Sequence, residues 1–310
     1  MLKKIIFMGT PLFAVPILKS LYQNGYNVSV VYTQPPQKSQ RGQRFTNSPI
    51  QNMSEILNID FRTPKNLKNN IEELNFIKGL KADLAIVVAY GKIIPEEYLN
   101  TTKYGFINIH ASLLPRWRGA APIQRSLINL DKETGLSIMK LVKEMDAGPV
   151  CQQFKVSISK NDNYETLAEK LSILASEKIL DVVDNIFNEN ISFKEQNHSD
   201  ATYAKKIIKS EGEINWKENA EDILGKINGL NPSPGAWFVY KGERYKILEA
   251  ELGFKSDKAG KVLDNNLEIA CGNKKSIKII KIQRQGKNIQ NTGEFMLGSS
   301  IKKDSNLSNE

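Results

Sequence analysis

Cysteine is scarce in this chain of 310 residues, which contains only Cys151 and Cys271. The two lie too far apart in sequence to form a metal-binding pair, and they provide no disulfide framework. A chain without structural disulfides suits a reducing compartment. We therefore expect a cytoplasmic protein with no bound metal.

Long apolar runs are also missing. No segment approaches the roughly 18 consecutive apolar residues of a membrane helix, so we expect no membrane association. An apolar run after Lys3 and Lys4 raises the alternative of a signal peptide, but it stops after four or five residues at Gly9. That is shorter than the apolar region of a signal, and a first core strand fits better.

Phosphate-binding fingerprints are absent as well. The first expected turn, Gly9-Thr-Pro-Leu-Phe13, has one glycine where the dinucleotide motif G-x-G-x-x-G needs three. The P-loop pattern G-x-x-x-x-G-K-[ST] does not occur either. The sequence therefore argues against the use of a nicotinamide cofactor or ATP.

Acidic residues are missing from the first 54 positions, which carry six Lys/Arg. Residues 55–200 hold 18 basic and 20 acidic side chains, and residues 201–310 hold 19 and 14, within a net charge of +9. Both ends of the chain are thus basic and the middle is not. This pattern indicates either simple solubility or a polyanionic partner.

The first half of the chain alternates short apolar runs with amphipathic stretches, which predicts a doubly wound, mostly parallel, Rossmann-like α/β sheet over residues 1–191. The expected strands are 3–8, 28–33, 84–89, 105–110, 135–142 and 150–157. The expected helices are 11–23, 122–130 and 164–190.

The character of the chain changes after residue 191. Residues 192–210 are polar and are typical of a linker. Residues 211–298 contain one helical segment and several short strand-like runs separated by turn signals, which predicts a smaller β-barrel domain, OB-like in size and pattern. Residues 299–310 have the composition of a disordered tail.

A carboxamide and an imidazole stand two residues apart in the apolar run Gly105–His110. Strand side chains alternate between faces, so Asn108 and His110 project from the same side. One can donate a hydrogen bond and the other can move protons, which makes a candidate active site. The alternative is a core strand that ends in a satisfied histidine.

Several motifs resemble enzymes that use 10-formyltetrahydrofolate as a formyl donor: Asn108-x-His110, Ser112-Leu-Leu-Pro115 and Met145-Asp-Ala-Gly148. Within that superfamily the chain is most similar to the methionyl-tRNA formyltransferases, on the segments 7–16, 32–35, 41–42, 115–124 and 201–204. The resemblance implies transfer of a formyl group to initiator methionyl-tRNA for translation initiation.

The resemblance also implies a catalytic set of Asn108, His110 and Asp146. Acyl transfer to an amine needs a donor to the oxyanion and a group that moves protons. Asn108 suits the first role, and His110, oriented by Asp146, suits the second. Which of His110 and Asp146 accepts the proton stays open. Without the resemblance, the sequence favours Asp146 as a turn residue before Gly148 and Pro149. Cys151 has no visible base and is interpreted as core filler.

Two segments are implied to line the folate site. Ser112, Leu113, Leu114 and Pro115 follow the strand that bears His110, at the carboxyl end where ligands bind in open α/β sheets. Ala89, Tyr90 and Gly91 follow the preceding strand, and they form either the opposite wall or an ordinary loop.

Two basic segments are candidates for contact with tRNA. The loop 33–49, which shows no clear secondary structure, holds Lys38, Arg41, Gly42 and Arg44, and in the resembled enzymes this loop engages the acceptor end. The run 274–287 has six basic residues and no acid, including Lys274, Lys275, Lys278 and Lys281. Its alternative is an edge strand that lysines protect from aggregation.

Two other functions remain open at this point. One is a folate-dependent formyltransferase for a small amine, such as a purine precursor or an amino sugar. The other is a catalytically silent RNA-binding protein. The C-terminal region and the basic loop count against the first, and the intact Asn108, His110 and Asp146 count against the second. We expect a monomer.

Overall fold

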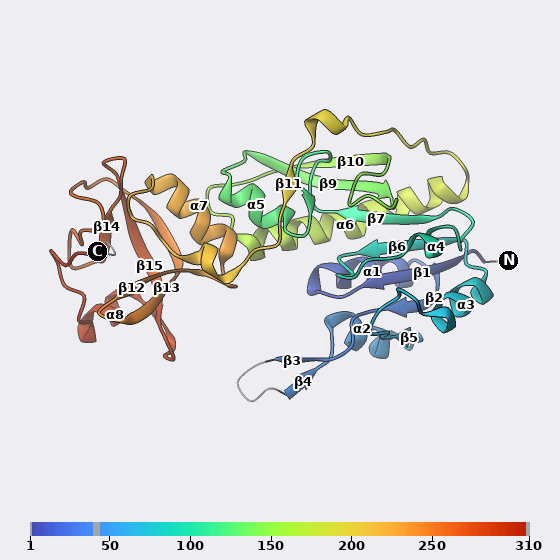
Figure 1. Ribbon diagram of the computed structural model, residues 1–310, viewed down its shortest axis with the longest axis horizontal. Helices are drawn as coiled ribbons and strands as arrows, with labels where there is room; N and C mark the ends of the chain where they lie inside the picture. The colour runs from blue at the N-terminus through green and yellow to red at the C-terminus, as the bar shows by residue number, and fades with distance from the viewer. Residues whose placement is uncertain (1, 40–43, 308–310) are drawn as a thin grey trace. The chain divides into compact units, whose positions relative to one another are not determined.

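The structure is a computed structural model that describes residues 2–39 and 44–307 (Figure 1). It divides into two compact units with separate hydrophobic cores. The first unit comprises Met1–Ala120, Thr134–Val156 and Ala168–Ala204. The second comprises Ala121–Glu133, Ser157–Leu167 and Lys205–Glu310. Each is described by itself.

The first unit is built on a seven-stranded sheet of order β10-β9-β7-β6-β1-β2-β5. The pairs that join β5, β2, β1, β6 and β7 are parallel, and β9 pairs antiparallel with β7. The expected mostly parallel α/β sheet is therefore confirmed. The strands are β1 (Lys4–Gly9), β2 (Asn27–Tyr32), β5 (Phe61–Arg62), β6 (Leu84–Val88), β7 (Phe106–His110), β9 (Glu133–Lys140) and β10 (Val150–Ser157).

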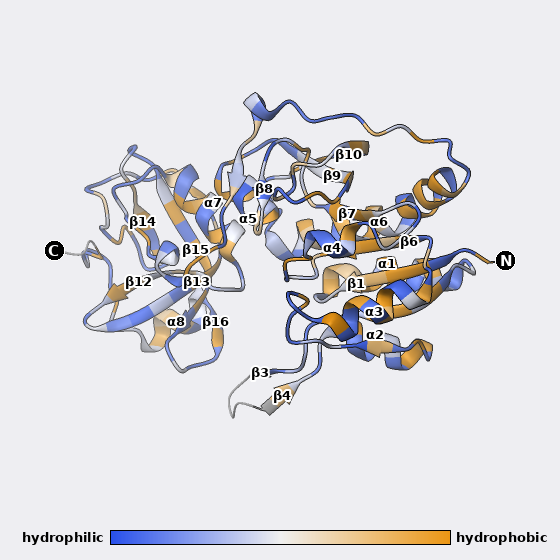
Figure 2. Cartoon of the chain, turned by 45° about the vertical axis from the view of Figure 1, so that its right-hand side comes forward, coloured by the Kyte–Doolittle hydropathy of each residue, from blue (hydrophilic) through white to orange (hydrophobic). Residues whose placement is uncertain are grey.

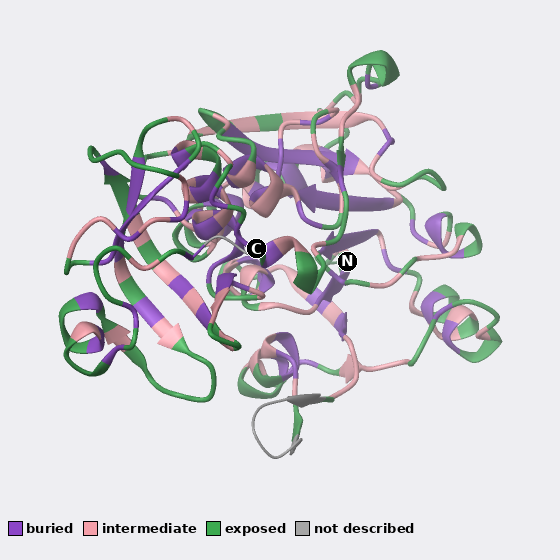
Figure 3. Ribbon diagram, turned by 60° about the vertical axis from the view of Figure 1, so that its left-hand side comes forward, coloured by how far each residue is buried: buried purple, intermediate pink, exposed green. Residues whose placement is uncertain are grey.

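The central strands form because they are apolar on both faces. Every residue of β6 and of β7 is buried, as parallel strands covered on both sides require. Figure 2 shows the hydrophobic colouring along these strands, and Figure 3 shows them as buried. One face packs against Ile77 of α3 (Ile71–Leu80) and Tyr98 of α4 (Glu96–Leu99).

Two further helices of this unit lie side by side. These are α1 (Val15–Gln23), which follows the 3-10 turn Leu12–Ala14, and α6 (Tyr164–Phe187). Ser20 Oγ donates to the carbonyl of Ser176 at 2.7 Å, and Tyr26 Oη donates to that of Leu180 at 3.2 Å.

The sequence analysis named no helix between residues 33 and 84, and the structure has two. α2 (Pro49–Leu57) begins where Ser48 accepts a hydrogen bond from the Gln51 N–H, and α3 begins where Asn70 accepts from that of Glu73. Both are ordinary side-chain N-caps. The segments 37–39 and 44–46 form a two-stranded hairpin, β3 (Gln37–Ser39) and β4 (Arg44–Thr46). The prediction of a loop without secondary structure there is therefore wrong.

The second unit contains an antiparallel sheet of order β12-β13-β15-β14, with β16 paired to β15. Its elements are α5 (Pro122–Ile128), α7 (Ala220–Leu230), β12 (Ala236–Tyr240), β13 (Glu243–Gly253), β14 (Glu268–Ala270), β15 (Ser276–Arg284), β16 (Ile289–Asn291) and α8 (Thr292–Gly298). Along β15 buried and exposed residues alternate over much of its length, so one face covers the core (Figure 3).

Helix α5 lies in the second unit, although its sequence position is inside the expected first domain. It packs closely on α7 at two glycines: a Cβ on Gly225 would lie 3.0 Å from the carbonyl oxygen of Leu127, and one on Gly229 would lie 2.9 Å from that of Gln124. Arg125 of α5 also pairs with Glu211 at 2.6 Å.

The expected linker and tail both carry tertiary structure. Within residues 192–210, Lys194 pairs with Val150, and β11 (Tyr203–Ala204) pairs in parallel with β8 (Arg118–Gly119). Two 3-10 turns, His198–Asp200 and Lys209–Gly212, lie in the same stretch.

In the tail, Ile301 and Leu307 are buried in the core of the second unit, and the Leu307 N–H donates to the carbonyl of Gly260 at 2.8 Å. The prediction of disorder is therefore wrong for residues 299–307. Residues 308–310 lie outside the described range.

Among residues 2–39 and 44–307, no helix is long and apolar enough to cross a membrane.

The buried tail makes a stability prediction. Ile301→Ala should lower the free energy of unfolding by about 2–5 kcal/mol, because it removes a fully buried aliphatic side chain from the core. Urea denaturation followed by circular dichroism measures the change, and Lys303→Ala, at an exposed position two residues further on, is the control. A loss below about 0.5 kcal/mol, the range typical of surface sites, would contradict the packing described here.

Candidate active site

Asn108 and His110 lie on β7 between two neighbouring strands. Asn108 pairs with Val87 of β6 and with Met139 of β9, and His110 pairs with Ser137 of β9. The two side chains share one face of the strand, as alternation requires. They are only 9% and 6% exposed, so their hydrogen-bond partners decide what they can do.

The imidazole of His110 is held at one nitrogen. Its Nε2 lies 2.8 Å from the backbone carbonyl oxygen of Trp117. A carbonyl only accepts, so Nε2 carries a hydrogen and donates. Nδ1 is the nitrogen left for chemistry, and it faces the Asp146 carboxylate, with Oδ2 3.7 Å away.

Asp146 completes the group from a loop between β9 and β10. Its backbone is left-handed, with φ +50°, a conformation that Asp tolerates better than most residues. Oδ2 accepts the N–H of Gly119 at 2.8 Å, and the amide nitrogen of Asn108 lies 3.5 Å from Oδ1. The three side chains that the family resemblance implied are therefore adjacent in space, a relation that the sequence did not reveal.

A glutamine that the sequence analysis missed anchors the Asp146 loop. Gln196 Nε2 donates to the carbonyls of Asp146, at 2.9 Å, and Gly148, at 2.7 Å. Its Oε1 accepts from Arg118 Nε at 3.0 Å and Nη2 at 2.7 Å. Arg118 Nη1 lies 3.3 Å from Nδ1 of His198. Gln196 and Arg118 are 8% and 3% exposed, and no local pattern in the polar stretch 192–210 marks Gln196.

The segment Ser112–Pro115 follows β7 at its carboxyl end and is fixed by side chains of β9 and β10. Ser137 Oγ donates to the Ser112 carbonyl at 2.7 Å and accepts the Leu114 N–H at 2.9 Å. Gln153 Nε2 donates to the Leu114 carbonyl at 2.8 Å. The Leu114–Pro115 bond is cis. Leu114 is buried, whereas Leu113 and Pro115 are partly exposed and can offer apolar surface to a ligand.

The segment Ala89–Gly91 follows β6 at the same edge of the sheet, since β6 and β7 are parallel. Ala89 and Gly91 are exposed and have left-handed backbones, with φ +47° and +77°. The Tyr90 ring lies in the core, and its carbonyl accepts from Thr10 Oγ1 and Gln34 Nε2 at 2.9 and 3.0 Å. Exposed backbone of this segment, rather than the tyrosine ring, therefore borders the strand ends.

Comparison with known proteins identifies the family. The formyl transferase family matches residues 3–183, and the formyl transferase C-terminal domain matches residues 206–300. The chain belongs to the formyl transferase family. It is 64% identical over 309 residues, with full coverage of both chains, to the methionyl-tRNA formyltransferase of Pelagibacter ubique. It is 40% identical to that of Brucella anthropi, covering 97% of this chain and 99% of the relative.

Solved structures of low identity share the fold. HypX from Aquifex aeolicus in complex with tetrahydrofolic acid is 15% identical with a TM-score of 0.67, and the match covers 98% of this chain and 49% of that one. WlaRD, a sugar 3N-formyl transferase crystallised with dTDP and 5-N-formyl-THF, is 17% identical with a TM-score of 0.68, covering 93% and 100%.

The basic loop of this formyl transferase is only partly described. Lys38 and Arg44 lie on the hairpin strands β3 and β4, where Lys38 pairs with Phe45 and Arg44 with Ser39. Arg41 and Gly42 lie outside the described residues. Phe45 is 70% exposed, an unusual position for a phenylalanine on a short hairpin.

The basic run 274–287 contains no acidic residue, but in the folded chain carboxylates from other segments lie beside it. Lys275 pairs with Glu221, Lys278 with Glu251 at 2.8 Å, and Lys281 with Glu249 at 2.5 Å. Lys274 has a left-handed backbone, with φ +58°. Three of the four lysines of this run that were predicted to contact tRNA therefore already face a carboxylate, which reduces the charge they offer to a phosphate.

Both cysteines favour the thiol over the thiolate. Both thiols are free, and burial raises the pKa of Cys151 to about 11 and that of Cys271 to about 12. Across the described residues, no group of His, Cys, Asp and Glu is arranged to hold a metal ion.

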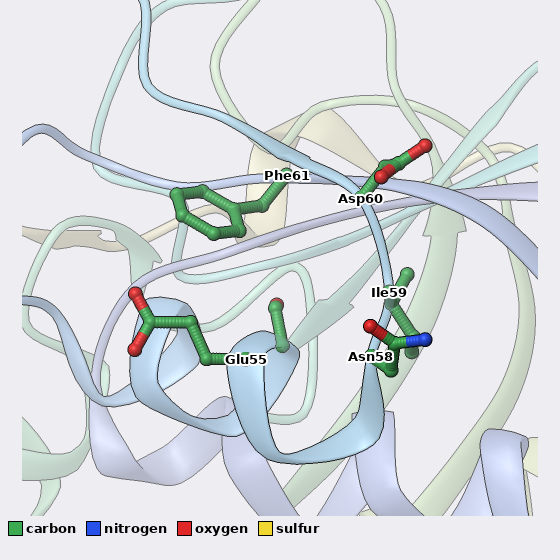
Figure 4. A pocket seen from close by; sticks show the side chains of 6 residues that line it. Glu55, Asn58, Ile59, Asp60 and Phe61 are labelled. Carbon is green, nitrogen blue, oxygen red and sulfur yellow. The ribbon is translucent and has the colours of Figure 1, made fainter.

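A cavity of about 390 Å³ lies beside α2 and β5 (Figure 4). Its lining comes from one short segment, Ser54–Phe61, with the carboxylates of Glu55 and Asp60 and the ring of Phe61. None of Asn108, His110 and Asp146 lines it, so it is separate from the candidate site.

The thiol environments predict low reactivity. Burial disfavours the thiolate, so at pH 8 both cysteines stay protonated and should alkylate roughly 100-fold more slowly than free cysteine. Labelling with iodoacetamide and mass spectrometry measures the rate, and the urea-unfolded chain, in which both should react, is the control. Rapid labelling of native Cys151 would contradict its burial.

Proposed function

We propose that this chain transfers the formyl group of 10-formyltetrahydrofolate to the α-amino group of initiator methionyl-tRNA. The observation that carries the proposal is the 64% identity, over full length, to a methionyl-tRNA formyltransferase. The adjacency of Asn108, His110 and Asp146 supplies the chemistry that such a transfer requires.

The reaction is a direct acyl transfer. The neutral amine attacks the formyl carbon, a tetrahedral intermediate forms, and the bond from that carbon to N10 of the folate breaks. The amine loses a proton and N10 gains one, so the step balances without an oxidant. Because the amine attacks the formyl carbon directly, no covalent enzyme intermediate is needed. Asn108 donates an amide hydrogen to the oxyanion, a type of contact that typically contributes about 10²–10³ in rate.

His110 and Asp146 act together on the protons. Because Nε2 is bound to the Trp117 carbonyl, only Nδ1 of His110 can exchange a proton with the substrate. Asp146, 3.7 Å from Nδ1, orients the imidazole. The Gly119 N–H holds the carboxylate in place for this role.

The folate binds at the carboxyl ends of β6 and β7, between Ser112–Pro115 and Ala89–Gly91. Thr10 after β1 and Tyr90 after β6 are hydrogen-bonded at the point where the strand order reverses. Ligands of open α/β sheets bind at such a switch point. Leu113 and Pro115 provide apolar contact, and the exposed backbone at Ala89 and Gly91 provides polar contact.

The two ends of the chain serve the tRNA. Residues 1–191 form the catalytic domain, and Lys38, Arg41, Gly42 and Arg44 contact the acceptor end. Residues 211–298 form an OB-like barrel that binds RNA, a reading supported by the match to the formyl transferase C-terminal domain and by the basic excess of residues 201–310. The enzyme works as a cytoplasmic monomer.

The experiment that tests the function compares acceptors. With 10-formyltetrahydrofolate as donor, charged initiator tRNA should be formylated at least 10³-fold more efficiently than free methionine or an amino sugar, the difference that several RNA contacts supply. Efficient transfer to a small amine would instead favour the sugar-type activity of the structural relatives. Binding of tRNA without transfer would favour a silent RNA-binding protein.

His110→Ala should remove most turnover while leaving the fold intact. A positioned proton-transfer group typically contributes about 10²–10⁴ in rate. Single-turnover formylation measures the loss, and a circular-dichroism melt checks folding. Activity within about fivefold of the unsubstituted enzyme would rule out the role given to His110.

Gln196→Ala should lower kcat by roughly 10- to 100-fold, because the Asp146 loop loses two of its anchors and small displacements of catalytic groups are costly. Gln196→Glu keeps an acceptor for Arg118 but loses both hydrogen-bond donors to the Asp146 loop, so its kcat should fall by a similar factor. KM for both substrates should change less than about threefold, since Gln196 acts through Asp146. Glu195→Gln, an exposed neighbour, is the control. An unchanged kcat in the two Gln196 variants would show that the loop needs no such anchor.

A further inference from the structure

Cations are distributed unevenly over the exposed face of the second unit's sheet. At one end, Lys278 and Lys281 of β15 lie opposite Glu251 and Glu249 of β13 in the strand register, and each forms an ion pair. Exposed pairs of this kind leave little net charge for a partner. The other end of the same sheet carries Arg244 and Lys246.

Arg244 and Lys246 share one face with Trp237. Trp237 is the register partner of Lys246, and Val239 is that of Arg244. Because directly paired residues point to the same side of a sheet, these four side chains lie together, opposite the core face that carries Phe238 and Tyr245. Across β15, Lys246 pairs with Gln283 rather than with an acid.

Each cation is held by non-acidic neighbours. The Arg244 guanidinium stacks on the Trp237 ring at 3.8 Å from the centroid. The methylenes of Lys246 lie over Gly235, where a Cβ would come within 2.5 Å of Lys246 Cδ, and Nζ lies 3.4 Å from the Pro232 carbonyl oxygen. Throughout the described part of the chain, no carboxylate forms an ion pair with either residue.

Arg244 and Lys246 lie close enough to influence one another. Lys246 is partly buried, and both burial and the nearby Arg244 lower its pKa. Two cations placed side by side without a carboxylate repel one another, and their positions are fixed by an aromatic ring and a glycine. Such a preformed pair suits a polyanion whose phosphates replace the missing carboxylates.

We propose that the face formed by Trp237, Arg244 and Lys246 binds the phosphodiester backbone of the tRNA, and that the paired lysines of β15 contribute less. The proposal rests on the proposed function and refines it, because it names which surface of the second unit meets the RNA. Arg244 and Lys246 each contact a phosphate, and Trp237 holds the guanidinium in place.

The test is an affinity measurement on full-length protein by fluorescence anisotropy with labelled initiator tRNA over a range of salt. Arg244→Ala with Lys246→Ala should weaken binding roughly tenfold and reduce the slope of log K against log salt by about 1–2, as the loss of two phosphate contacts requires. Lys278→Ala with Lys281→Ala removes the same charge and should weaken binding less than about threefold. Equal or reversed losses would overturn the assignment.

Two further variants separate charge from folding. The first double variant, Arg244→Lys with Lys246→Arg, keeps both charges and should retain most of the tRNA affinity and the salt slope. The second, Arg244→Gln with Lys246→Gln, removes both charges. It should bind tRNA as weakly as the alanine pair, at an unchanged melting temperature. If the glutamine pair binds tRNA normally while the unsubstituted enzyme still formylates charged tRNA, the proposed function stands and this surface is not its RNA contact. If the glutamine pair loses binding to anionic phospholipid vesicles but keeps normal tRNA affinity, the proposal is likewise overturned, and the surface binds lipid instead.

Discussion

The arrangement of Asn108, His110 and Asp146 depends on keeping one nearly buried carboxylate in place. A charge removed from water is tolerated only when hydrogen bonds replace its hydration. Asp146 meets that requirement through the Gly119 N–H and the nearby Asn108 amide, while its backbone is fixed by Gln196. The chain segments 108–119, 146–148 and 196 are thereby joined at one point. The left-handed backbone of Asp146 follows from the same constraint, because the side chain must turn back toward β7.

This constraint explains why the polar stretch that contains Gln196, late in the first unit, has a structural role. Gln196 and Arg118 are buried polar groups that bind one another, and Gln196 also donates to two loop carbonyls while Arg118 lies beside His198 Nδ1. β11 pairs with β8 just beyond them, and a Cβ on Gly119 would lie 2.8 Å from the Ala204 carbonyl oxygen, so the Gly119 N–H that binds Asp146 is positioned by the same pairing. A chain that merely linked two domains would need none of these contacts.

Charge in the second unit shows the difference between sequence neighbours and spatial neighbours. The six basic residues of 274–287 stand without an acid along the chain. In the antiparallel sheet, however, β13 brings Glu243, Glu249 and Glu251 opposite Arg284, Lys281 and Lys278. The same strand places Arg244 and Lys246 against Trp237, Val239 and Gln283 instead, at positions that the sequence did not single out.

The sequence by itself determined the features that depend on local periodicity. Buried parallel strands are rich in apolar residues and amphipathic helices repeat every 3.6 residues, so the elements predicted at 84–89, 105–110 and 164–190 match β6, β7 and α6 to within a few residues. The shared face of Asn108 and His110 was recognisable in the same way. Only the tertiary structure decided what depends on contacts between distant segments. These are the approach of Asp146 to His110, the anchor at Gln196, the packing of α5 on α7, and the burial of Ile301 and Leu307. Helices α2 and α3 and the hairpin at 37–46 were missed because their patterns are short. Their ends are set by single caps and by pairing, which periodicity does not register.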